Sequence, residues 1–264
     1  MVDGIVPRLR KENIGYIEKK ISLLDKVPIL HEPYVEWYIE NNNFLKSEFF
    51  YKSNIKIVDN VDLYTNIKLR FLNASHSAVS YIGLLLGYKF VHEVMEDYDC
   101  YKFIYNFMNL EVLPIVKVPK DFNKSKYINL VLERFKNPYL NDELKRISID
   151  GSYKIKIRLL DTIKDRLSDK NCSFSSFVIT CWFKFLFGKD INNNLIEIND
   201  PNKKTLLDII NNKNNIDKII KEKNKSKKDK PKKDKSIFHK KSDAGKGDIP
   251  RRSISIDEWG KKWE

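Results

Sequence analysis

Residues 64–88 read YTNIKLRFLNASHSAVSYIGLLLGY, and this stretch decides the fold class of the chain. Apolar side chains recur in it at spacings of three, four and seven, and further apolar residues fill the gaps. The period predicts a helix, and the apolar density predicts that the helix is buried on most sides. Gly83 and Gly87 predict close packing of a neighbouring segment, or a break near Gly87.

The segments on either side extend this prediction. Before residue 61 the sequence predicts short irregular pieces with turns and one short strand at Ile55–Val58, and convincing strands are otherwise nearly absent. We therefore expect an entry segment over 1–60 and a mainly α, multi-helical domain over 61–220. Further helices are expected over 99–112, 125–135, 141–149, 154–167, 173–187 and 201–221.

The positive charge of the chain is concentrated near its end. Of the 264 residues 42% are apolar, which is enough for a sizeable core. Residues 221–241 hold 11 lysines against three acidic side chains, so most of the net charge of +13 lies there. Such a segment has little to bury and repels itself. We expect a disordered Lys-rich linker over 221–241 and a short module of unknown role over 242–264.

Several classes of protein are not expected. Cys100, Cys172 and Cys181 are too few and too irregular for a disulfide framework and form no C-x-x-C pair, so we expect no metal site. The apolar stretches are shorter than the roughly 18–20 residues needed to span a bilayer. The first residues lack the pattern of a signal peptide. The expected setting is the cytoplasm, without a membrane.

Lys68, Asn73 and His76 are candidate catalytic residues for the oxidation of an alcohol. In an α-helix each residue turns by about 100°, so these side chains lie on one face over about 12 Å of the axis. A lysine whose pKa is lowered by burial can take a hydroxyl proton, an asparagine can donate to a developing oxyanion, and a histidine can hold another hydroxyl. The same residue types are also common on a solvated helix face, and spacing alone does not decide between the two interpretations.

The 64–88 stretch closely resembles the K-x4-N-x2-H region of the polyol-specific long-chain dehydrogenases, which include the mannitol 2-dehydrogenases and fructuronate reductases. Further pieces resemble this family in the same order, over about residues 1–210: MVDGIVP at 1–7, Glu32-Pro33 with Trp37, VHEVMED at 91–97, ERFKNP at 133–138 and DGSYKI at 150–155. Two positions depart from the family pattern. Gly4 stands where the family usually has arginine, and Lys156 stands where it usually has proline. Both positions are near substrate-contacting segments, so the resemblance does not define the substrate specificity.

The resemblance implies an oxidoreductase that transfers hydride between NAD, or NADP, and a sugar alcohol or a sugar acid such as mannonate or fructuronate. It implies that Lys68 is the general base, with Asn73 and His76 at the reacting oxygen and its neighbours. It also implies a substrate contact for Asp3 at the edge of the site. Lys154 would meet the far end of the substrate and would suit the carboxylate of a hexuronate.

The family also has an N-terminal Rossmann domain, which the resemblance does not find here. None of the nine glycines forms a G-x-G-x-x-G, and no alternation of strands and helices suggests a doubly wound sheet. We expect the nucleotide to be bound mainly by the absent domain, and this chain alone to be weak or inactive. It would then be either a split-gene product that pairs with a separate Rossmann-domain chain or a remnant of a broken gene. An apolar patch should then be exposed, with Phe49, Phe50, Tyr51 and Phe71 as its candidate members.

A second interpretation is a helical interaction module that is no longer catalytic and has a basic tail that binds nucleic acid. A flexible basic segment can neutralise phosphates. The lysine-rich run, however, has no interleaved aromatic residue to stack on bases and no folded recognition element. Nucleic acid is therefore not the expected partner.

Overall fold

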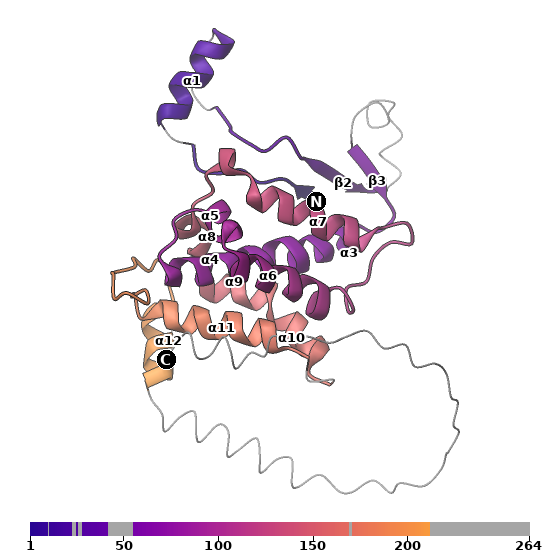
Figure 1. Ribbon diagram of the computed structural model, residues 1–264. Helices are drawn as coiled ribbons and strands as arrows, with labels where there is room; N and C mark the ends of the chain where they lie inside the picture. Colours follow the sequence, from indigo (N-terminus) through magenta and orange to yellow (C-terminus); the bar gives the residue numbers. More distant parts are fainter. Residues whose placement is uncertain (10, 23–24, 26–27, 42–54, 169–170, 212–264) are drawn as a thin grey trace, which may run out of the picture. The chain divides into compact units, whose positions relative to one another are not determined.

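The computed structural model of the protein describes residues 1–9, 11–22, 25, 28–41, 55–168 and 171–211. Within these residues the fold is mainly helical, as the sequence predicts, with one small sheet (Figure 1). The predicted linker and C-terminal module, and residues 49–51 of the predicted apolar patch, lie outside the described residues.

A three-stranded sheet precedes the helical body. Strand β1 (Val2–Asp3) pairs antiparallel with β2 (Glu36–Glu40), and β2 pairs parallel with β3 (Ile55–Val58). Helix α1 (Lys11–Ile21) lies between β1 and β2 in the chain. The predicted strand at Ile55–Val58 is confirmed. The expectation of only irregular pieces before it is wrong, because β1, α1 and β2 all lie there. The two residues of β1 are too few to show the alternation that identifies a strand.

The helical body follows the predicted segments closely. Its elements are α3 (Val61–Ile67), η1 (Lys68–Asn73), α4 (Ala74–Leu86), α5 (Val91–Glu96), α6 (Tyr98–Asn106), η2 (Phe107–Val112), α7 (Lys124–Lys136), η3 (Pro138–Leu140), α8 (Leu144–Ser148), α9 (Gly151–Arg158), α10 (Leu160–Arg166) and α11 (Ser173–Leu186). The single helix expected over 154–167 is two helices. The break is at the buried Leu159, whose φ of −116° departs from helical geometry.

Helix α4 lies at the centre of the body, packed against α8 on one side and α11 on another. Its small residues let these neighbours approach. A Cβ at Gly83 would lie 2.4 Å from Cγ2 of Val94 and 2.6 Å from Cδ1 of Leu144, which confirms the predicted close packing. Gly87 ends the helix with a φ of 88°, a left-handed conformation that glycine adopts without strain, and this confirms the predicted break.

The predicted exposure of Phe71 is wrong. Its side chain is fully buried and makes an edge-to-face contact with Tyr127 of α7, with ring centroids 6.0 Å apart. Exposed apolar side chains near the N-terminus lie on and beside the sheet: Val2 and Trp37 in its strands are 52% and 48% exposed, and Val35, just before β2, is 56% exposed. Helix α12 (Lys203–Asn211) lies in a second compact unit from Lys204 onward, and none of its residues is buried.

Candidate active site

The candidate catalytic residues lie in and beside a π-helical turn. Segment η1 is a π-helix that begins at Lys68 and ends at Asn73, and α4 then carries His76. In a π-helix the hydrogen bonds run from i to i+5, so each turn holds more residues than in an α-helix. The angles expected for a regular α-helix therefore do not apply across η1. Such turns are uncommon in proteins and occur frequently at functional sites.

The amine of Lys68 turns back toward the N-terminal strand. Its Nζ donates a hydrogen bond to the backbone oxygen of Val2 in β1. Burial lowers the pKa of Lys68, and the positive charges of Arg134 and Arg158 lower it further, while Asp3 opposes them. A half-buried amine of this kind can accept a proton more readily at neutral pH than a solvated lysine.

Asp3 is held by a buried network. Its Oδ1 accepts from Nη2 of Arg134 at 3.0 Å and its Oδ2 accepts from the hydroxyl of Tyr127 at 2.7 Å. Arg134 also donates to both carboxylate oxygens of Glu32, from Nε at 3.0 Å. Asp3, Glu32 and Arg134 are 1%, 2% and 5% exposed. This network fixes β1 onto α7 and thereby places the carbonyl that receives Lys68.

Asn73 is fixed through its backbone. Its carbonyl oxygen accepts from Nη1 of Arg158 in α9 at 3.2 Å, and the same nitrogen donates to Oγ of Ser77 at 3.1 Å. Nε of Arg158 is buried without a hydrogen-bond partner among the described residues. Burial lowers the pKa of Arg158, yet the guanidinium remains charged at physiological pH. It supplies a second cation beside the Lys68–Asn73 turn.

His76 lies one turn further along, in an enclosed position. Its ring stacks on Phe135 of α7, with centroids 4.4 Å apart and an angle of 29° between the planes. Its Nε2 is 4.0 Å from Oδ2 of Asp142. Burial, together with the charges of Arg158 and neighbouring cations, lowers the pKa of His76 well below 6.5. The imidazole is therefore neutral near pH 7.

Lys154 lies on α9 one helical turn before Arg158, and its Nζ donates to the backbone oxygen of Ile147 at 3.0 Å. Burial lowers its pKa, the charges of Arg158 and Arg146 lower it further, and Asp150 opposes them. The positive charges of Arg146 and Arg158 therefore act on both Lys154 and His76.

Sequence reasoning missed four members of this arrangement: Arg134, Asp142, Arg146 and Arg158. A local signal was available for Arg158, because it is four residues after Lys154 and shares its helix face. Arg134 stands inside the quoted 133–138 piece, where nothing marked it as a buried ion-pair centre. Asp142 and Arg146 lie in a turn and a short helix, and only the fold brings them to His76.

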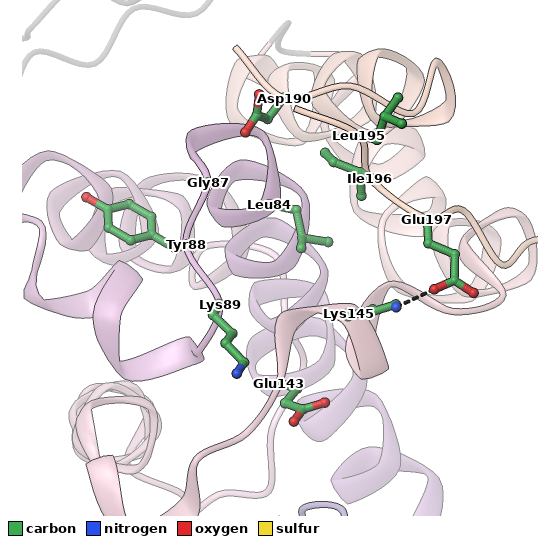
Figure 2. A pocket seen from close by; sticks show the side chains of 10 residues that line it. All are labelled: Leu84, Gly87, Tyr88, Lys89, Glu143, Lys145, Asp190, Leu195, Ile196 and Glu197. Atoms are coloured by element: carbon green, nitrogen blue, oxygen red, sulfur yellow. Dashed lines mark hydrogen bonds and ion pairs between the residues drawn. The ribbon is translucent and has the colours of Figure 1, made fainter. Parts of the chain in front are cut away.

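Other features of the described residues lie apart from these groups. A pocket of about 350 Å³ opens between the end of α4, α8 and residues 190–197, and none of Lys68, Asn73, His76, Asp3 or Lys154 lines it (Figure 2). Lys145 and Glu197 form an ion pair across it. Nowhere in the described ranges do three or more His, Cys, Asp or Glu side chains gather as they would around a metal ion. No helix in the same ranges is long and apolar enough to cross a membrane.

Comparison with known proteins gives a consistent result. Residues 60–237 match the family model described as the mannitol dehydrogenase C-terminal domain. Mannitol dehydrogenase 2 of Saccharomyces cerevisiae is 34% identical over 208 residues, which are 78% of this chain and 41% of that protein. Mannitol 2-dehydrogenase of Pyricularia oryzae is 34% identical over 211 residues, 78% of this chain and 42% of that one.

Two solved structures of polyol dehydrogenases are also similar to this chain. The mannitol 2-dehydrogenase of Pseudomonas fluorescens, in a ternary complex with NAD and D-mannitol, matches with a TM-score of 0.73 and 28% identity, over 80% of this chain and 43% of that one. A substrate-free D-sorbitol dehydrogenase matches with a TM-score of 0.70 and 28% identity, over 76% of this chain and 42% of that one. The chain thus spans about two fifths of the length of these relatives.

Proposed function

Since the chain belongs to the mannitol dehydrogenase family, we propose that it forms the sugar-binding half of a nicotinamide-dependent polyol or hexuronate dehydrogenase. The observation that carries this proposal is the half-buried amine of Lys68, which lies in the π-helical turn between α3 and α4 and whose pKa is lowered by burial. A lowered pKa makes this amine better suited to general-base work than a solvated lysine.

In the proposed reaction the substrate alcohol loses its hydroxyl proton to Nζ of Lys68 and its carbon-bound hydrogen as hydride. NAD, or NADP, supplies the chemistry of accepting that hydride when it is bound. The negative charge that develops on the substrate oxygen lies next to the donors expected at Asn73 and to the guanidinium of Arg158. In the reverse direction the protonated amine of Lys68 returns the proton to the carbonyl oxygen.

His76, Asp3 and Lys154 take supporting roles in this proposal. His76 holds a neighbouring hydroxyl. Asp3 raises the pKa of Lys68 against the surrounding cations and borders the site. Lys154, with Arg146 and Arg158 in its electrostatic environment, favours a substrate with a carboxylate at its far end, such as mannonate or fructuronate. A neutral polyol such as mannitol, which the Pseudomonas fluorescens relative holds in its solved complex, is the other substrate to test.

The nucleotide is expected to be bound mainly by a Rossmann domain that packs against the residues described here. Support comes from the outer face of the sheet. Trp37 pairs with Val2 and with Ile55, so their side chains share a face, and alternation places the other apolar residues there too. The face consists of Val2, Trp37, Ile39, Ile55 and Ile57, and Val35 lies just before β2. These residues precede the 60–237 match, and an apolar face so exposed is typical of an interaction surface.

The test uses a hybrid protein in which this chain replaces the matched part of the Pseudomonas fluorescens enzyme. Binding of NADH to the hybrid, followed by nucleotide fluorescence, shows that the assembly has formed. Absorbance of the reduced nicotinamide is then followed with mannitol, fructose, fructuronate and tagaturonate, with both NAD(H) and NADP(H). We expect turnover with at least one substrate. A hybrid that binds NADH and turns over none of them would overturn the proposal.

A further inference from the structure

Two buried polar atoms that have no hydrogen-bond partner among the described residues face each other at the candidate site. They are Nε2 of His76 and Oδ2 of Asp142, which lie 4.0 Å apart and are both shielded from solvent. A buried polar atom left without a partner costs on the order of 1–3 kcal/mol. Closing this separation by about 1 Å would give both atoms a hydrogen bond of ordinary length.

Two other oxygen atoms of Asp142, Oδ1 and the backbone oxygen, accept hydrogen bonds and hold the residue in place. Oδ1 accepts from Nε of Arg146 at 3.0 Å and from Nη2 at 2.5 Å. The backbone oxygen of Asp142 accepts from the amide of Val91 at 3.0 Å. Because a guanidinium only donates, the carboxylate that it holds acts as an acceptor. Burial raises the pKa of Asp142, while the charge of Arg146 and its hydrogen bonds to Oδ1 lower it. In the ionised carboxylate Oδ2 faces His76 as an acceptor that has no donor among the described residues.

His76 has one proton to offer. The ring is held in place by its stacking on Phe135. Burial and the charges of Arg158, Arg146, Arg134 and Lys68 lower the pKa of His76 well below 6.5, so the ring is neutral and carries a single N–H. The ring nitrogen that is enclosed without a partner is Nε2 and not Nδ1.

We propose that Asp142 is a positioning residue that holds the single N–H of His76 on Nε2, so that Nδ1 presents a lone pair and accepts a hydrogen bond from a substrate hydroxyl. The substrate part of this inference rests on the proposed function, whereas the tautomer is a property of this chain alone. The tautomer makes His76 an acceptor, whereas the guanidinium of Arg158 can only donate. His76 thereby selects for a hydroxyl over a carbonyl or an ether oxygen at the sugar position that it contacts.

The experiment measures the tautomer directly. The full chain is labelled with ¹⁵N, and long-range ¹H–¹⁵N spectra of its histidine rings are recorded near neutral pH. The chain has four histidines, and the spectrum of His76→Asn assigns the signals of His76 by their absence. We expect the wild-type chain to show the neutral Nε2–H form of His76 as its main tautomer.

The variant Asp142→Asn should invert this result. Arg146 still needs an acceptor, so the amide oxygen of the new side chain turns to Arg146 and its NH₂ group faces Nε2 of His76. Nε2 must then accept, and His76 should change to the Nδ1–H form. Glu143→Gln is the matched control, because it removes a neighbouring carboxylate without touching the His76–Asp142 pair, and it should leave the tautomer unchanged.

Each outcome of the NMR experiment supports or overturns the proposed tautomer of His76. An Nδ1–H tautomer in the wild-type chain, or an Nε2–H tautomer that persists in folded Asp142→Asn, would overturn the assignment. If Asp142→Asn fails to fold, the wild-type spectrum decides alone. Failure here leaves the hydride-transfer proposal standing, because that proposal is tested by turnover of the hybrid protein. Loss of turnover in the hybrid likewise leaves the tautomer measurement unaffected.

Discussion

The amine of Lys68 donates a hydrogen bond to the backbone oxygen of Val2, 66 positions earlier in the sequence. This contact joins the π-helical turn to the first strand of the sheet. Val2 also contributes its side chain to the exposed apolar face. A domain that covers this face would therefore lie close to Lys68, the proposed base. The proposed cofactor domain and the proposed base would therefore meet at β1.

The ion-pair network that holds β1 should be important for stability. Arg134→Met leaves the carboxylates of Asp3 and Glu32 buried without their cation. Breaking a buried pair from one side costs about 3–5 kcal/mol, so urea unfolding should show a loss of that size. Lys164→Met is the control, since the pair between Lys164 and Asp161 is exposed and should contribute about 0.5 kcal/mol or less. Equal losses in the two variants would contradict the role given to Arg134.

Two glycines with different surroundings, Gly83 in the closely packed α4 and Gly15 in α1, predict opposite effects when they are replaced by alanine. Gly83→Ala places a Cβ against Val94 and Leu144 and should destabilise the chain by about 1–3 kcal/mol. Gly15→Ala lies in α1 with nothing within 4 Å of the new Cβ, and it should stabilise the helix by about 0.5–1 kcal/mol. Thermal melts of both variants test this. A neutral Gly83→Ala would mean that α4 and its neighbours lie further apart than the structure places them.

Much of the helical body is predictable because its signal is local. The apolar period over 64–88 identifies α3 to α4, and Gly87 marks the end of α4. The sheet was largely missed because its strands are short and their pairing joins segments that are distant in sequence. The split at Leu159 and the π-helical turn at Lys68 leave the apolar period nearly unchanged, so the pattern could not reveal them.

In the candidate site, too, the residues of one local stretch could be predicted and the residues that surround them could not. Lys68, Asn73 and His76 could be named from one continuous stretch. Their surroundings could not, because Arg158 reaches the backbone of Asn73 across 85 positions and Asp142 reaches His76 through a turn before α8. Contacts of this kind depend on tertiary packing, which a single sequence does not encode in any local period.

The lowered pKa of His76 predicts a pH dependence of stability. The folded ring stays neutral below pH 6.5 while the unfolded ring takes up a proton, so the unfolded chain binds more protons and stability falls as the pH falls below 6.5. Between about pH 7 and about pH 5 this contribution amounts to at most about 2 kcal/mol. In His76→Asn it should be absent. Urea unfolding of both proteins at the two pH values measures it, and an unchanged dependence would contradict the burial of a neutral imidazole.

The exposed sheet face predicts an effect on assembly without an effect on folding. Trp37→Asp in the hybrid protein should weaken the packing of the nucleotide-binding part and lower turnover, because it places a charge in an apolar contact. The isolated chain should melt as the wild type does. Tyr139→Asp is the control, since Tyr139 is 88% exposed and lies away from the sheet in sequence and pairing. Equal turnover in the two hybrids would argue against this face as the contact.

The most direct test of the central claim is the turnover of Lys68→Ala in the hybrid protein, with and without added methylamine. Loss of a general base should slow alcohol oxidation by about 10²–10⁴-fold, and the free amine should restore part of it. Lys126→Ala, an exposed lysine on α7, is the control and should keep the full rate. With Lys68 present, oxidation should slow as the pH falls through the pKa of Lys68, which burial places below 10.5, because only the neutral amine accepts the proton. A Lys68→Ala protein that oxidises its substrate at the wild-type rate would contradict the account.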